Sequence, residues 1–203
     1  MSESRPRMPA SERRELVLDA ALAVFGQQGY AGATTDMVAR AAGVSQPYVV
    51  RMFGTKEQLF LEVLGSALDQ LMAAFRRAVA GDPELPIGRR LGLAYFELTA
   101  NRSILLCLMH AFASGADPVI GAAAREGFMR VYRLLRDEAG MDAAATHDFL
   151  AGGMLANVVL GLQLVDAEGA DPDVEELVCT VFPEKLELIR AGQPPRVDYR
   201  SRS

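Results

Sequence analysis

Cysteine is scarce in this chain, which has only Cys107 and Cys179 in 203 residues, each inside an apolar run. Two thiols do not make the disulfide framework that holds small secreted domains together. Residues 1–14 also lack the apolar stretch that a signal peptide requires, so we expect no signal peptide there. Both absences predict a protein of the reducing cytoplasm.

A long uncharged stretch is missing as well. The longest one covers residues 149–165, is at the short edge for a membrane-spanning helix, and contains Asn157 and Gln163. We expect it to form a buried helix. With 50% hydrophobic and 23% charged residues, the composition predicts a folded protein with a sizeable core.

The sequence shows neither the alternation of a β-strand nor an internal repeat. Instead, apolar residues recur at helical spacing between breaks at Gly, Pro and Asp, which predicts an all-α protein. The expected helices cover residues 11–28, 36–42, 46–53, 56–79, 87–99, 103–113, 118–139, 143–165 and 172–191. We expect residues 1–10 to form a flexible arm and residues 193–203 a flexible tail.

Short local signals predict where the first helices begin and end. Gly29 and Gly43 are expected to end the first two helices. The expected N-caps share a hydroxyl group: Ser11, Thr34 or Thr35, Ser45, and Thr55, the last in a capping box with Gln58.

Three helices within residues 11–55, the last two short and joined at Gly43 and Val44, are typical of a helix-turn-helix unit. The major groove of DNA admits one α-helix, whose first residues meet the base edges. A small core of Val38, Val44, Val49 and Phe53 would hold the last helix, which leaves Gln46, Tyr48, Val50 and Arg51 on other faces. Gln46 can pair with adenine, Arg51 with guanine or phosphate, and Tyr48 can donate to a phosphate or stack on a sugar.

Pro47 lies in the first turn of that helix, where a backbone N–H has no partner in any case. The charge distribution agrees with a nucleic-acid partner for this part of the chain. Residues 1–60 have a net charge of +1, whereas residues 61–203 have a net charge of −6.

Residues 14–60 resemble the DNA-binding head of the TetR family of one-component transcriptional regulators. The matching motifs are Ala20-Ala21, Phe25, Gly29-Tyr30, Thr34-Thr35, Val38-Ala39, Ala42-Gly43-Val44-Ser45, Phe53-Gly54-Thr55-Lys56-Glu57 and Leu59-Phe60. The resemblance implies a three-helix head (11–55), a linking fourth helix, and a helical ligand-binding and dimerisation body (56–192). It implies DNA contacts by Thr35, Tyr48, Arg51 and Lys56. We expect Ser45, Gln46 and Pro47, at the start of the last helix of the head, to contact DNA as well.

The chain departs from the family pattern at Pro47, Tyr48 and Val50, where relatives often have glycine, a small hydroxyl residue and an aromatic residue. It departs again at Arg51 or Met52, where relatives often have histidine. We therefore carry over the mode of docking on DNA but not the base preference.

A cavity in the body would bind a largely apolar molecule. The candidate lining residues are Leu71, Met72, Phe75, Tyr95, Phe96, Thr99, Cys107, Met109, His110 and Tyr132. Ordinary core packing is the alternative for each of them. Cys107 and His110 share a helix face, but two ligands are too few for a metal site, and we predict no metal or other cofactor.

The last two expected helices, about 143–191, have small residues for close approach and more apolar area than a surface helix needs. We expect them to form a homodimer interface, with an internal bundle as the alternative. The sequence thus predicts a homodimeric repressor, not an enzyme, that binds a near-palindromic operator and is released by a small apolar effector. The alternatives are a constitutive DNA-binding regulator without a ligand and an all-α enzyme or carrier.

Overall fold

The computed structural model describes residues 9–98, 101–166 and 171–182, and all regular structure in these ranges is helical. The predicted all-α class is therefore confirmed for the described part of the chain. The predicted tail and nearly all of the predicted arm lie outside it. The chain divides into two compact units, residues 1–150 and 151–203, and the boundary expected at residue 55 remains a prediction.

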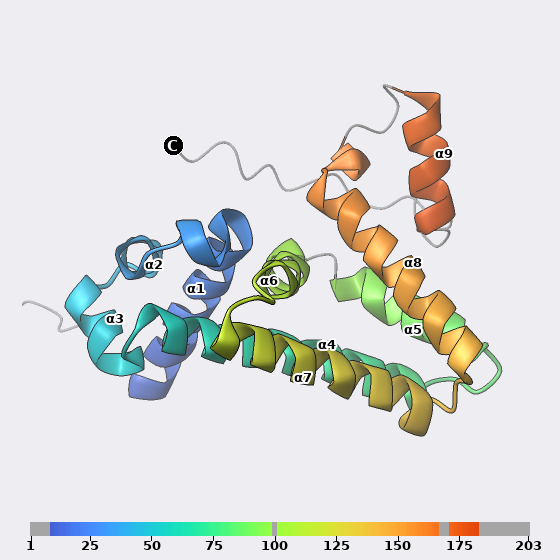
Figure 1. The fold of residues 1–203 in the computed structure, drawn as a ribbon, viewed down its shortest axis with the longest axis horizontal. Coiled ribbons are helices and arrows are strands. Elements are labelled where there is room, and N and C mark those ends of the chain that lie inside the picture. The colour runs from blue at the N-terminus through green and yellow to red at the C-terminus, as the bar shows by residue number, and fades with distance from the viewer. Residues whose placement is uncertain (1–8, 99–100, 167–170, 183–203) are drawn as a thin grey trace, which may run out of the picture. The chain divides into compact units, whose positions relative to one another are not determined.

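Three helices make up the N-terminal head: α1 (Ala10–Gly32), α2 (Thr35–Ala41) and α3 (Gln46–Phe53). Figure 1 shows them gathered at one end of α4. α1 begins at Ala10 after Pro9, so the prediction that Ser11 is the N-cap is wrong; proline already sets the chain direction there. Gly29 leaves helical geometry at φ 67°, as its predicted role as a stop requires, and a short turn continues to Gly32.

α4 (Lys56–Val79) is the longest element of the first unit. It begins with the predicted capping box, in which Thr55 and Gln58 bond each other's backbone N–H groups. It ends where Arg90 Nη1 donates to the carbonyl oxygens of Ala78, Val79 and Gly81. The guanidinium thus bonds carbonyls at and just beyond the C-terminus of the helix, where helical partners run out, and the Ala78 carbonyl also accepts the Gly81 N–H.

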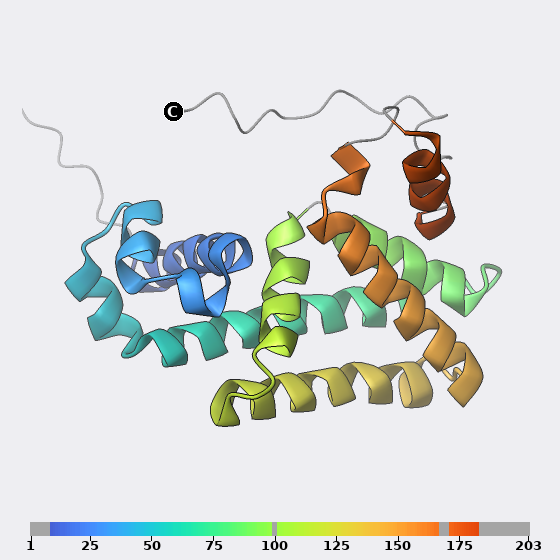
Figure 2. The same cartoon turned by 45° about the horizontal axis from the view of Figure 1, so that its top comes forward.

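The remaining helices of this unit pack along α4: α5 (Ile87–Leu98), α6 (Arg102–Ala113) and α7 (Pro118–Arg133), which continues as a π-helical turn at Leu134–Glu138. α7 runs beside α4 in Figures 1 and 2. Arg76 makes an ion pair with Glu138, and Arg130 makes one with Asp69, so charged side chains join the two helices at the surface.

α1 and α6 cross closely, which joins the head to the helices that follow it (Figure 1). A Cβ atom added at Gly26 would lie 3.0 Å from Ser103 Cα, so any larger residue here would require the two helices to move apart. The ring nitrogen Nε2 of His110 lies 3.3 Å from the Gly26 carbonyl oxygen. Backbone atoms of both helices, at Gly26 and Ser103, therefore take part in this contact together with the His110 side chain.

The C-terminal helices are α8 (Ala143–Gly161), a 3₁₀ turn at Leu164–Asp166, and α9 (Pro172–Val181), which Asp171 caps. The helix expected over 143–165 is thus interrupted after Gly161, where Gln163 has a positive φ of 58°. The part of the last helix expected over 183–191 lies outside the described residues.

The prediction that residues 149–165 form a buried helix is wrong for the single chain. Only 22% of the most apolar window of α8 is buried, and the exposed apolar residues include Leu155, Val158 and Leu162. By length and hydropathy α8 would also suit a membrane, but one such helix is weak evidence because helices of soluble proteins meet the same criteria.

Candidate nucleic-acid interface

The turn between α2 and α3 has a defined backbone geometry. Gly43 adopts φ 66°, a left-handed conformation that glycine enters without steric strain. Its N–H donates to the Arg40 carbonyl at 3.2 Å, and the Val44 N–H donates to the Ala39 carbonyl at 3.0 Å. This pair of bonds is a Schellman motif, which ends α2 and sets the direction in which α3 leaves.

The inner face of α3 is fixed by Val49 and Phe53, which are 0% and 5% exposed. The Arg14 guanidinium from α1 lies over the Phe53 ring, 4.7 Å from its centre, and forms an ion pair with Glu62 of α4. Arg14 therefore connects α1 to both α3 and α4, and a helix as short as α3 depends on such tertiary contacts.

The outer face of α3 exposes Gln46, Pro47 and Arg51 to solvent. Ser45 occupies the predicted N-cap position, but its side chain makes no capping hydrogen bond, so this part of the prediction is wrong. Pro47 lies in the first turn as expected. Its missing N–H is harmless there because the first turn of a helix has no acceptor for it.

Gln46 is joined to α2 by a hydrogen bond. Its amide nitrogen Nε2 donates to Thr35 Oγ1 at 3.2 Å. Thr34, not Thr35, is the cap of α2, since its hydroxyl accepts the Met37 N–H. Thr35 is thus left to orient Gln46, whose second amide hydrogen and Oε1 remain able to read an adenine.

Tyr48 is half-buried next to two guanidinium groups. The Arg51 guanidinium lies 5.3 Å from the centre of its ring, and that of Arg13 lies 5.8 Å from it. Both distances fall in the range of cation–π contacts. Arg13 was not among the sequence-based candidates, because its contact with Tyr48 joins two helices far apart in the sequence.

The Lys56 ammonium has partners within the protein, unlike a lysine that contacts only a phosphate. Its ammonium donates to the carbonyl oxygens of Tyr30 at 2.9 Å and Ala33 at 3.2 Å, and it lies 4.5 Å from the centre of the Tyr30 ring. Burial, followed by the carboxylates of Glu57 and Asp117, raises the pKa of Tyr30, so the phenol stays neutral. Lys56 joins α4 to the end of α1 and keeps one of its three donors for another partner.

The predicted effector residues fall into two groups. Leu71, Met72 and Phe75 of α4 and Cys107 of α6 are buried, and Tyr95, Phe96, Met109, His110 and Tyr132 are half-buried. Phe75 contacts Tyr95 with ring centres 6.2 Å apart. Thr99 lies outside the described residues.

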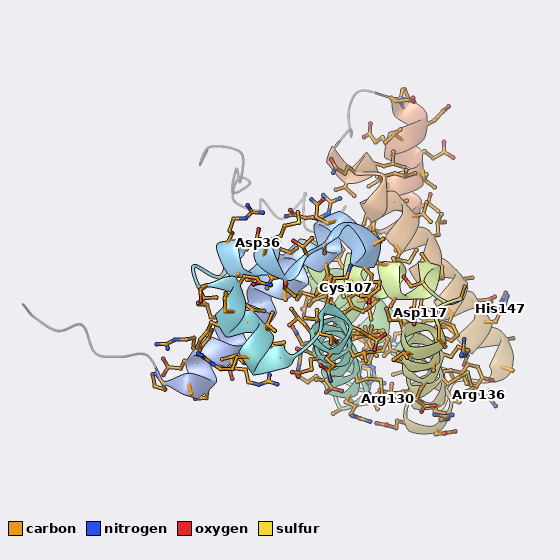
Figure 3. All side chains as sticks on the ribbon, turned by 60° about the vertical axis from the view of Figure 1, so that its left-hand side comes forward. Asp36, Cys107, Asp117, Arg130, Arg136 and His147 are labelled. Carbon is orange, nitrogen blue, oxygen red and sulfur yellow. The ribbon has the colours of Figure 1, made fainter. Side chains whose placement is uncertain are left out.

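Cys107 lies in the interior (Figure 3), and burial raises the pKa of its thiol to about 12. His110 is directed instead to the Gly26 carbonyl of α1. An open groove of about 250 Å³ lies elsewhere on the first unit, lined by Ala74, Arg77, Ala78, Gly81, Asp82, Arg90, Leu93, Ala94 and Glu97. None of the predicted effector residues lines this groove.

Comparison with known proteins shows where the resemblance is strongest. Residues 17–63 match the sequence pattern of the bacterial regulatory proteins of the tetR family. The chain is 41% identical over 73 residues to the HTH-type transcriptional activator FasR of Mycolicibacterium smegmatis, a match that covers 36% of this chain and 33% of that protein. Matches to curated relatives cover from 29% to about half of the relative's length.

Solved structures are similar over most of the chain. A TetR-like transcriptional regulator from Rhodococcus sp. RHA1 is similar with a TM-score of 0.63 at 20% identity, covering 89% of this chain and 99% of that one. The multidrug binding protein EbrR, solved in complex with imidazole, is similar with a TM-score of 0.52 at 25% identity, covering 97% and 100%.

Proposed function

Because this chain belongs to the tetR family of bacterial regulatory proteins through its residues 17–63, we propose that it is a transcriptional regulator that binds an operator as a homodimer. The observation that carries the proposal is the exposed polar face of α3, held from behind by Val49 and Phe53. A helix fixed in this way fits the major groove, with Gln46 and Arg51 toward the bases.

Phosphate contacts would hold this orientation. Thr35 lies in the first turn of α2, where unpaired backbone N–H groups favour an anion. The remaining donor of Lys56 and the guanidinium of Arg51 would supply positive charge for other phosphates. Phosphate contacts position a protein on DNA, while base contacts select the sequence.

Dimerisation would use α8. Leu155 and Val158 are 44% and 45% exposed, three residues apart on one helix, and Leu162 follows at 65%. A two-fold axis would bring this apolar surface against its own copy and bury it in both chains. To bind one side of an operator, such a dimer would need its two α3 helices about 34 Å apart, the spacing of successive major grooves.

An apolar effector would act through the helices next to α4. Phe75 packs against Tyr95 and Phe149, and Thr146, one turn before Phe149, is fully buried. Among the described residues the Thr146 hydroxyl has no hydrogen-bond partner. An apolar molecule with one hydrogen-bonding group suits such surroundings, and EbrR, which shares this fold, is described as a multidrug binding protein.

We propose repression because occupying a promoter is sufficient to block it. Effector binding would shift α4 and α6, change the spacing of the two heads, and release the operator. A coupling of about 1–3 kcal/mol changes affinity about 5- to 150-fold. FasR is described as an activator, so the sign of regulation depends on where the operator lies relative to the promoter.

The test of DNA binding is selection from a random duplex library with the full-length protein, followed by fluorescence anisotropy on the enriched sequence. We expect a near-palindromic consensus with two half-sites. If no duplex is enriched at low salt, the proposal fails. A thermal-shift screen identifies small apolar molecules that stabilise the protein, and each of them is then added to the operator complex to test release. If none of these molecules weakens DNA binding, the protein is a constitutive regulator.

The dimer is tested with Leu155→Arg and Val158→Arg, measured by light scattering. We expect monomers that bind the operator weakly. The matched control is Val119→Arg on α7, which is 42% exposed in a different helix and should leave the dimer intact.

A further inference from the structure

α3 exposes one large apolar side chain beside its buried face. Val50 is 41% exposed, while Val49 beside it and Phe53 one turn later are buried. A single exposed apolar residue is ordinary on most surfaces. The position of Val50 gives it significance, because it lies on the helix that we propose enters the major groove.

The neighbours of Val50 define what it would meet. Successive residues of an α-helix turn by about 100°, so Val50 lies between Gln46 and Arg51 around the helix. Gln46 is also one turn before it and shares its side of the helix. A base edge that both polar side chains contact would therefore lie on the side of the helix to which Val50 belongs.

The major groove offers one apolar group, the 5-methyl of thymine. Gln46 suits an adenine, and every adenine is paired with a thymine whose methyl lies in the same groove. Gln46 Nε2 donates to the Thr35 hydroxyl of α2 at 3.2 Å, and this bond favours one orientation of the amide.

We infer that Val50 is a specificity-determining residue that packs on a thymine 5-methyl beside the base pair read by Gln46. This inference rests on the proposed DNA-binding function and adds a base preference to it. Half-sites should contain a thymine whose methyl contributes affinity, next to an A·T pair that requires Gln46.

The experiment replaces thymine by deoxyuridine, which removes only the methyl. After selection of an operator, each thymine is replaced in turn, and affinity is measured for the wild type and Val50→Ala. Burying one methyl is worth about a fourfold change in affinity. We expect one thymine per half-site to show this loss with the wild type, and about a 15-fold loss when both half-sites are changed.

The Val50→Ala variant carries the decisive comparison. It should bind the thymine operator more weakly than the wild type and should be insensitive to deoxyuridine at the same position. Val50→Thr, which keeps one methyl and the branched shape, should retain an intermediate sensitivity. Val50 is exposed, so all three proteins should unfold at the same temperature by circular dichroism.

Two results would overturn the inference and are distinguishable from failure of the proposed function. If an operator is selected but no thymine methyl matters, or if the methyl matters equally to wild type and Val50→Ala, then Val50 does not read it. If no duplex is selected at all, DNA binding itself is wrong and the inference fails with it.

Discussion

The guanidinium of Arg51 lies over the ring of Tyr48, 5.3 Å from its centre, on the exposed side of α3. From this contact we propose a role for Tyr48 different from the two predicted from the sequence, donation to a phosphate and stacking on a sugar. The ring restricts Arg51, whose long side chain would otherwise lose considerable freedom on meeting DNA. Arg51 would contact the DNA, and Tyr48 would be a positioning residue.

Tyr48→Phe keeps the ring and removes the hydroxyl, whereas Tyr48→Leu removes both. We expect Tyr48→Phe to bind the operator within about twofold of the wild type, and Tyr48→Leu to bind about two- to fivefold more weakly, the range of an exposed cation–π contact. The loss should vanish in an Arg51→Ala background. If Tyr48→Phe and Tyr48→Leu lose operator affinity equally, the hydroxyl and not the ring is the part of Tyr48 that supports binding.

Arg51→Ala should lower operator affinity about 5- to 150-fold if the guanidinium contacts a base. Its side chain is exposed, so the unfolding temperature should not change. Arg133→Ala on α7 removes an exposed arginine of equal charge and should leave binding unaltered. Loss of folding in Arg51→Ala would show that its side chain supports the head instead.

Lys56→Met should lower the free energy of unfolding by about 1–3 kcal/mol, because it leaves the carbonyls of Tyr30 and Ala33 without their donor. It should also reduce the slope of log affinity against log salt by about 1, since one phosphate contact is lost. Denaturant unfolding and binding at several salt concentrations measure the two effects separately. A normal slope with lowered stability would leave Lys56 as a purely structural residue.

Gly26→Ala should push α1 and α6 apart, because the added Cβ would lie 3.0 Å from Ser103 Cα and 3.1 Å from the Ser103 carbonyl oxygen. Overpacking of this kind destabilises by about 1–3 kcal/mol. Gly65→Ala is the control, since its Cβ meets nothing within 4 Å and alanine improves helix propensity by up to about 1 kcal/mol. In urea unfolding we expect Gly65→Ala to be the most stable protein, the wild type to be intermediate, and Gly26→Ala to be the least stable.

Cys107 should resist alkylation in the folded protein. Its pKa of about 12 keeps the thiol protonated at pH 8, while Cys179 is only half-buried. Iodoacetamide followed by mass spectrometry should modify Cys179 first and Cys107 only after unfolding. The raised pKa also means that the unfolded chain binds fewer protons above pH 9, so this thiol lowers stability as pH rises from about 9 to 12.

Local signals account for what could be predicted correctly about the helices. The Thr55–Gln58 capping box and the left-handed Gly43 each act within a few residues, so the sequence alone locates them. The prediction of Ser11 as an N-cap is also based on a local signal, but it is wrong because the helix begins earlier, with Pro9 in the N-cap position. The prediction that residues 149–165 form a buried helix is wrong for the single chain, because composition alone does not distinguish a core helix from a helix whose apolar side chains are exposed to solvent.

The sequence by itself determined the helical class, most helix bounds and the residues on the outer face of α3, since periodicity and capping are short-range properties. Only the tertiary structure decided how those residues are used. Lys56 bonds carbonyls 26 and 23 residues earlier in the chain, and His110 approaches Gly26 from 84 residues away. Such contacts depend on how helices pack against one another, which no local pattern encodes.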